Sequence, residues 1–160
     1  MIICSKLPKR FYFAVTSFGL MPMSAFMQKI EHIGIAVKDL SIAIPLYESL
    51  LNTPCYKKEM VESEKVQTAF FQTGESKVEL LQSTDADGVI ARFIDKKGEG
   101  FHQVAFGVED IESEIQRLKA AGFQFISEAP KKGADDMLVC FLHPKSTGGV
   151  LVEICQKIQP

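Results

Sequence analysis

Two short segments of this chain each occur twice, about 71 to 74 positions apart, and this repeat restricts the possible folds more than any other feature. HIGIAVKDL at 32–40 returns as QVAFGVEDI at 103–111, and VELLQ at 78–82 returns as VEICQ at 152–156. This register aligns His32 with Gln103 and Glu79 with Glu153. If the two halves pair about a pseudo-twofold axis, these four side chains can converge on one point.

Each half is predicted to form a strand, a helix and then further strands. Residues 30–37 alternate, so Ile33 and Ile35 face one side while His32 shares the other side with small residues. Glu79 and Glu153 likewise face away from their apolar neighbours. The later strands are expected at 66–72, 77–82, 124–127, 137–142 and 150–156.

Two helices are predicted after Asp39 and Asp110, which can cap them. Pro45 implies that the first helix is kinked or begins later. Its expected buried stripe comprises Ile42, Leu46, Leu50 and Leu51, and that of the second helix comprises Ile111, Ile115 and Leu118.

The predicted fold class is therefore α+β, with two tandem βαβββ modules forming a curved mixed sheet around one site. We expect a single domain over 27–160, with module 1 at about 28–82, a linker carrying a helix at 83–99, and module 2 at about 100–157. Residues 1–26 have basic and apolar residues and no acidic one. They are expected to be a disordered extension, a targeting segment, or a stretch added by a start codon placed too early.

The composition is that of an ordinary globular protein, with 46% hydrophobic residues and a net charge of −2. No basic stripe is present, so neither nucleic acid nor a membrane is expected as a partner. Four scattered cysteines without a C-x-x-C pair favour a reducing compartment. We therefore expect a cytoplasmic protein, or a mitochondrial one if 1–26 is a transit peptide.

A metal site is predicted at the repeat-equivalent positions His32, Glu79, Gln103 and Glu153. One nitrogen and three oxygen donors suit a six-coordinate divalent ion, which leaves two positions open for substrate. The candidates are Co²⁺, Ni²⁺, Mn²⁺, Mg²⁺, Fe²⁺ and Zn²⁺. Taken singly, each of these residues could instead be an ordinary solvated side chain; their joint placement favours the metal site.

The turn from His143 to Gly149, HPKSTGG, is polar and rich in glycine. Lys145, Ser146 and Gly148 could bind an anionic group of a substrate through the lysine and backbone N–H groups. A plain hairpin loop explains the same residues equally well.

From Met27 onward, the chain resembles the vicinal oxygen chelate superfamily, and most closely its methylmalonyl-CoA epimerase branch. The residues that carry the resemblance are HIGIAV at 32–37, GESKVELL at 74–81, GEGFHQVAF at 98–106 and LHPKSTGGVLVE at 142–153. The resemblance implies a paired βαβββ fold, a divalent metal and a homodimer. It also aligns Gln67 with a glutamate proposed as a base in a bacterial epimerase, so that Gln67 is expected to contact substrate but cannot take a proton.

These features lead to the hypothesis of a metal-dependent isomerase that epimerises methylmalonyl-CoA, or a related 2-substituted malonyl thioester, through an enediolate. Glu153 is the expected general base. One alternative is a glyoxalase I-type lactoylglutathione lyase, since related sites of that type also combine one glutamine, one histidine and two glutamates. The other is a member of the superfamily that binds a small molecule without catalysis.

Overall fold

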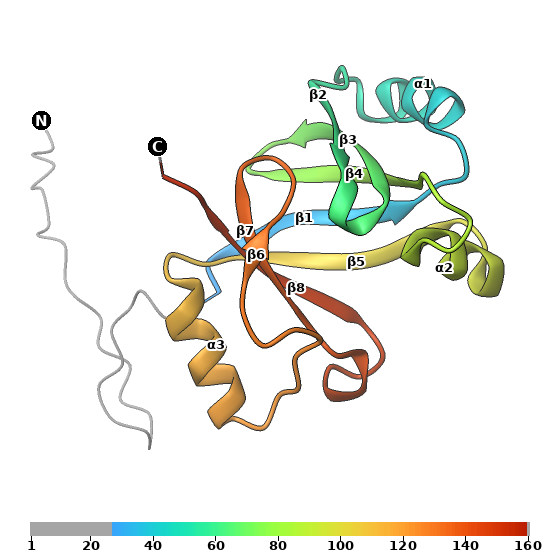
Figure 1. The fold of residues 1–160 in the computed structure, drawn as a ribbon. Coiled ribbons are helices and arrows are strands. Elements are labelled where there is room, and N and C mark those ends of the chain that lie inside the picture. Colours follow the sequence, from blue (N-terminus) through green and yellow to red (C-terminus); the bar gives the residue numbers. More distant parts are fainter. Residues whose placement is uncertain (1–26, 160) are drawn as a thin grey trace, which may run out of the picture.

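The computed structural model describes residues 27–159, and within this range eight strands form one mixed sheet. The sheet curls into a half-barrel, with β1 (Lys29–Ala36) and β5 (Gly100–Gly107) lying side by side at its centre (Figure 1). The predicted α+β fold is confirmed. The predictions for residues 1–26 lie outside the described part of the chain.

The strand order is β2-β3-β4-β1-β5-β8-β7-β6, which places the two repeats on either side of the central pair. β1 runs parallel to β4 and β5 runs parallel to β8, whereas β1 and β5 are antiparallel. Each half therefore repeats the same local topology about the central pair. The remaining strands are β2 (Lys57–Val61), β3 (Val66–Thr73), β4 (Ser76–Ser83), β6 (Lys131–Lys132), β7 (Met137–Leu142) and β8 (Leu151–Lys157).

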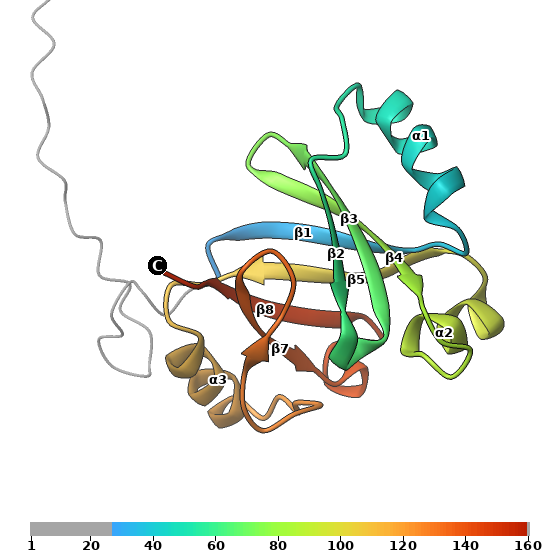
Figure 2. The ribbon, with the colours of Figure 1, turned by 45° about the horizontal axis from the view of Figure 1, so that its top comes forward.

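Helix α1 (Leu40–Leu51) packs on the outer face of β3 and β4 (Figure 2). The Asp39 carboxylate accepts a hydrogen bond from the Ser41 N–H, so the helix begins directly after its cap and not later, although Pro45 lies inside it. The predicted buried stripe is wrong for Ile42, Leu46 and Leu50, which face outward with exposures of 61–71%, and is confirmed for Leu51, which packs on the core. The other residues of the core face are Leu40, Ala43, Ile44 and Tyr47.

Helix α3 (Ile111–Ala120) covers the outer face of the second half, and here the prediction holds. The Asp110 carboxylate accepts from the Ser113 N–H, and Ile111, Ile115 and Leu118 are buried against β7 and β8. The helix expected in the linker is α2 (Val89–Lys97). Its Ile90 packs on Ala36, Val66 and Leu81, so that α2 closes one end of the inner face of the sheet.

Two segments differ from the predicted strands. The edge strand β2 was not predicted, since it begins with three consecutive charged residues and has no alternation of apolar and polar residues. Residues 124–127 do not form a strand, although Phe125 makes an isolated bridge to Leu142. The edge of the second half is instead the two-residue strand β6, whose turn into β7 leads back toward the first half.

None of the helices in the described range is long and apolar enough to cross a bilayer.

Candidate metal centre and substrate cavity

The concave face of the sheet encloses a cavity of about 210 Å³. Its floor is built by β1, β4, β5 and β8, which carry the predicted ligands, and apolar side chains of β3, α2 and β7 form its walls. The segment 126–135 of the second half also lines it. The site is thus open to solvent at its mouth but apolar around the polar floor.

The structure brings all four predicted ligands together on this floor. His32, Glu79, Gln103 and Glu153 are each exposed by 6% or less. His32 Nε2 lies 3.3 Å from Glu79 Oε2 and 3.5 Å from Glu153 Oε2. Gln103 Nε2 donates a hydrogen bond of 2.7 Å to the same oxygen of Glu153.

His32 Nε2 carries the clearest signal of a missing partner. Among the buried side-chain nitrogen and oxygen atoms of residues 27–159, it is the one that makes no hydrogen bond. Such atoms are nearly always satisfied in folded proteins. A nitrogen without a partner that faces two buried carboxylates, with an amide beside them, fits a divalent cation in both charge and donor type.

The pKa values of His32 and Glu79 on the floor are both raised, as expected of a site that suits a cation. Burial opposes the charged form of His32, but the nearby carboxylates of Glu153, Glu31 and Glu79 outweigh it and raise the pKa of His32 well above its ordinary value. Burial raises the pKa of Glu79 to about 7, with the negative charge of Glu153 contributing and His32 opposing. Without added positive charge, the two buried carboxylates therefore favour retention of protons near His32.

Two irregularities in the central strand pair aim side chains at this floor. In the pairing of β1 with β5, Glu31 falls between Ile30 and His32 without a partner, and His102 is passed over between Phe101 and Gln103. A β-bulge adds one residue and lets two successive side chains turn to the same side. Glu31 and His32 are accordingly both buried, and His102 lines the cavity together with Gln103.

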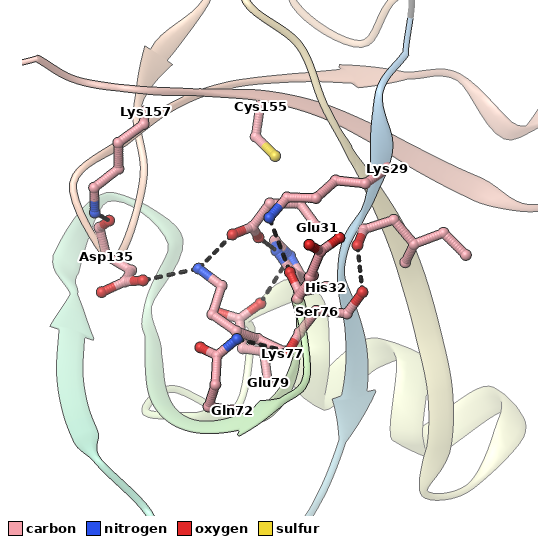
Figure 3. Close-up of polar contacts among 12 residues, drawn as sticks. Lys29, Glu31, His32, Gln72, Ser76, Lys77, Glu79, Asp135, Cys155 and Lys157 are labelled. Atoms are coloured by element: carbon pink, nitrogen blue, oxygen red, sulfur yellow. Dashed lines mark hydrogen bonds and ion pairs between the residues drawn. The ribbon is translucent and has the colours of Figure 1, made fainter. Parts of the chain in front are cut away.

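Glu31 joins His32 to a chain of buried ion pairs (Figure 3). Its Oε2 lies 2.6 Å from His32 Nδ1, and its Oε1 lies 2.6 Å from Lys77 Nζ. Lys77 in turn lies 2.8 Å from Asp135 Oδ2, on the turn between β6 and β7. Burial alone would raise the pKa of Glu31, but His32 and Lys77 outweigh it and lower this pKa, so Glu31 is held ionised.

His102 occupies the equivalent place beside Gln103. Its Nδ1 lies 2.9 Å from Gln103 Oε1, and its ring meets Phe93 of α2 edge-on at 4.9 Å. Burial lowers the pKa of His102, so the ring is neutral. Strict alternation along β5 would turn His102 to the helix side, but the bulge turns it into the cavity beside Gln103.

Cys155 lies close to the same cluster. Glu31, His32 and Cys155 each offer one potential ligand atom within 4.8 Å of the others, and this buried group could hold a metal ion. Glu31 is already paired with Lys77, however, and burial raises the pKa of the Cys155 thiol. The Nε2 side of His32, which faces Glu79 and Glu153, is therefore the better place for a cation.

The other predicted site residues lie away from the cavity. Val66, Thr68 and Phe70 of β3 line it, so the alternation of the strand turns Gln67 to the opposite face, with Ala69 and Phe71. The sequence alignment that gave Gln67 a substrate contact is corrected in this respect, and buried Thr68 occupies the inner position. The sequence does not show which residues of β3 face the cavity, because the strand has apolar residues on both faces.

The turn that carries Lys145, Ser146 and Gly148 joins β7 to β8, and none of these residues lines the cavity. The Lys145 N–H donates to His143 Nδ1, and Ser146 Oγ donates to the backbone oxygen of His143. These local bonds shape the turn. The role of the three residues in substrate binding stays a prediction.

Residues 31–141 match the Glyoxalase/Bleomycin resistance protein/Dioxygenase superfamily. The chain belongs to this superfamily. It is 38% identical over 130 residues to the protein YqjC of Bacillus subtilis, which is uncharacterised, covering 81% of this chain and 93% of YqjC. It is also 36% identical over 129 residues to the mitochondrial methylmalonyl-CoA epimerase of Homo sapiens, covering 80% of this chain and 73% of the human protein.

Among solved structures of the superfamily, the fold is similar to that of a methylmalonyl-CoA epimerase variant from Streptomyces coelicolor, which was solved in complex with 2-nitronate-propionyl-CoA. The TM-score is 0.80 at 28% identity, and the match covers 84% of this chain and all of that one. The chain is thus a methylmalonyl-CoA epimerase-like member of the superfamily, and the resemblance seen in the sequence is confirmed.

Proposed function

We propose that this protein is a metal-dependent epimerase of methylmalonyl-CoA or a related 2-substituted malonyl thioester. The observation that carries the proposal is the unpartnered Nε2 of buried His32, which faces two carboxylates in the floor of the cavity. The likeness to named epimerases supports the reaction class. The cavity supports a small acyl group, because its walls are largely apolar.

His32, Glu79, Gln103 and Glu153 would hold the metal ion. The two carboxylates offset its charge, and His32 adds the one nitrogen donor. When bound, a divalent ion would supply a Lewis acid that stabilises the negative charge developed as the α-proton leaves. The apolar walls formed by residues such as Phe70, Leu81 and Met137 keep water from this charge.

Glu153 is the proposed general base. It is 3% exposed, it lines the cavity, and it comes from the central part of β8. In the present orientation of its amide, Gln103 donates a hydrogen bond to Glu153 Oε2 and holds the carboxylate in one orientation. A carboxylate held in this way can take the α-proton and return it, provided that the α-carbon of the substrate lies within hydrogen-bond reach.

The same ligand set favours a second candidate, a glyoxalase I-type lactoylglutathione lyase. One glutamine, one histidine and two glutamates meet in the cavity, as that activity would require. The likeness to proteins named as epimerases favours the malonyl thioester. A comparison of methylmalonyl-CoA with the thiohemiacetal of glutathione and methylglyoxal as substrates distinguishes the two.

The decisive experiment follows exchange of the α-proton of methylmalonyl-CoA in D₂O by NMR, using the full chain with and without Co²⁺. We expect exchange that depends on the metal. If the folded, metal-bound protein shows no exchange, epimerase activity on methylmalonyl-CoA is excluded. The protein then acts on another substrate or binds a small molecule without catalysis. A homodimer and a cytoplasmic location remain predictions, to be tested by light scattering and by cell fractionation.

The role of Glu153 is tested by Glu153→Gln at saturating Co²⁺, with the repeat-equivalent Glu79→Gln as the matched control. Loss of a general base costs about 10²- to 10⁴-fold in rate. We expect a loss of this size in Glu153→Gln and a smaller loss in Glu79→Gln once both are saturated with metal. Equal losses in the two variants would show that Glu153 acts only as a ligand.

A further inference from the structure

The two bulges in the central strand pair lie at equivalent positions of the repeat. Glu31 precedes His32 in β1, and His102 precedes Gln103 in β5. Each bulged residue makes a side-chain contact with the ligand that follows it, at 2.6 Å for Glu31 and 2.9 Å for His102. Both halves of the fold thus use the same backbone irregularity to place a second polar group behind the first.

The contact with Glu31 determines which ring nitrogen of His32 carries a hydrogen and which one is left for the cavity. An ionised carboxylate can only accept, so the Nδ1 atom of His32 must carry the hydrogen and donate it. When a cation displaces the proton from Nε2, the ring keeps its Nδ1–H, and the Nε2 lone pair is directed toward Glu79 and Glu153. The contact with Glu31 therefore holds the ring in the orientation that a cation between these groups needs, with Nδ1 as the nitrogen that keeps its hydrogen.

Glu31 is itself held in place from the far side. Its second oxygen is paired with Lys77, which is 8% exposed, and Lys77 is anchored in turn by Asp135. The carboxylate therefore has little freedom to rotate away from His32. Lys77 comes from β4, two residues before Glu79, so the strand that supplies a carboxylate ligand also supports the histidine.

His102 acts on an amide and not on a ring. Its Nδ1 contacts Gln103 Oε1, while Gln103 Nε2 donates to Glu153. Edge-on packing against Phe93 fixes the ring of His102. Because neutral histidine can donate or accept at Nδ1 according to its tautomer, His102 can hold the Gln103 amide in this orientation or in the one turned by half a rotation, which directs the oxygen at the cavity.

We propose that Glu31 and His102 are positioning residues, each of which orients the metal ligand that follows it. The inference rests on the proposed metal site but names residues beyond the ligands and the base. Groups that support metal ligands in this way typically contribute 10- to 100-fold to metal affinity. The duplicated bulge therefore gives each half its own means of fixing a ligand.

The test measures Co²⁺ affinity by calorimetry for the wild type, Glu31→Gln, Glu31→Asp and His102→Phe. Glu31→Gln removes the charge, whereas Glu31→Asp keeps the charge but withdraws the carboxylate from Nδ1. We expect both to bind Co²⁺ about 10- to 100-fold more weakly. His102→Phe keeps an aromatic ring against Phe93 and is expected to lower affinity by about 10-fold. Glu75→Gln, which removes an exposed charge on the β3–β4 turn, is the control and should bind as the wild type does.

A spectroscopic measurement separates positioning from a general effect on the fold. The chain has three histidines, so ¹H–¹⁵N NMR of the Zn²⁺-loaded, histidine-labelled protein can be assigned by substitution. In the wild type and in the control Glu75→Gln, we expect the Nδ1–H of His32 to exchange slowly with water. In both Glu31 variants, we expect this hydrogen to exchange faster. The same signal can be followed in the metal-free protein.

Two results would overturn the inference. One is wild-type affinity in both Glu31 variants, and the other is an unchanged His32 signal in them. Failure of the proposed function has a different signature, because it is seen in the wild type itself as absent metal binding or as metal binding without proton exchange.

Discussion

The two halves of this molecule supply the same number of side chains to the site but in different states. In the first half, His32 presents an unpartnered nitrogen, and Glu79 has a pKa raised to about 7 by burial. In the second half, the Gln103 amide donates a hydrogen bond to Glu153, and Gln103 also contacts His102. The ligands of the first half thus include a nitrogen without a hydrogen-bond partner, whereas both ligands of the second half have one. In the proposed site, the first half would therefore supply the nitrogen donor, whereas the second half adds an amide that orients the Glu153 carboxylate.

The residues that lie opposite the ligands also differ between the two halves. Across the central strands, His32 lies opposite Ala105, and Gln103 lies opposite Gly34. A Cβ on Gly34 would lie 2.7 Å from Gln103 Cγ. The first half therefore leaves room for the ligand of the second, whereas the residue opposite His32 is a fully buried alanine.

The largest expected effect comes from removing one ligand from each half. His32→Ala removes the one nitrogen donor, and we expect Co²⁺ binding to fall below detection in calorimetry. Gln103→Ala removes a weaker, neutral donor and should reduce affinity by about 10- to 100-fold. Equal losses would contradict this difference between the halves.

Gly34→Ala sharpens the comparison of packing. The new methyl group must displace Gln103 or Leu81, which lies 3.1 Å from the position of the Cβ. We expect a loss of about 1–3 kcal/mol in the free energy of unfolding, as is typical of overpacked cores, together with weaker Co²⁺ binding. The matched control is Ala105→Gly, which should cost about 0.5–1 kcal/mol through chain entropy and leave the affinity unchanged. Urea unfolding and calorimetry of both variants measure these effects, and unchanged affinity in Gly34→Ala would show that Gln103 is free to move.

The repeat and the alternation of apolar residues were sufficient to predict the paired halves and the meeting of His32, Glu79, Gln103 and Glu153. Each of the two bulges lies on the N-terminal side of its ligand, so from His32 and from Gln103 onward the period of two still holds. The residues behind the ligands could not be predicted in the same way. A bulge shifts the parity by one, so strict alternation placed Glu31 away from His32, and no composition signal marks the shift.

The wrong face of α1 has a different cause. This helix has apolar residues around most of its circumference, so several stripes at helical spacing compete. The choice among them depends on the outer face of the sheet, where Phe71 and Leu80 of β3 and β4 pack with Ala43 and Tyr47 of α1. Helix α3 was predicted correctly because its outer face is charged and leaves one apolar stripe.

Asp135 of the second half is linked to His32 of the first half through the ion pairs of Lys77 and Glu31. Its carboxylate is paired with Lys77 and Lys57, and its backbone N–H donates to Glu59, so the β6–β7 turn is tied to β2 and β4. Asp135 has a φ of 52°, a conformation that asparagine also tolerates, so Asp135→Asn removes the charge without added backbone strain. We expect a loss of about 1 kcal/mol in the free energy of unfolding at pH 7.

The pH dependence of this loss identifies its source. Burial would raise the pKa of Asp135, but Lys77 outweighs it and the pKa is lowered below the ordinary value of 3.8. A depressed pKa contributes stability that is present above the unfolded value and is lost as the pH falls through the folded one. The difference between the wild type and Asp135→Asn should therefore be constant from pH 7 to about pH 5 and shrink below pH 3.8. Asp136→Asn, at the exposed neighbour with a similar φ of 55°, should show almost no difference at any pH. If the two variants lose equal stability at pH 7, the turn is held by its backbone alone, and the ion pairs that link the second half to Lys77, Glu31 and His32 contribute nothing to the fold.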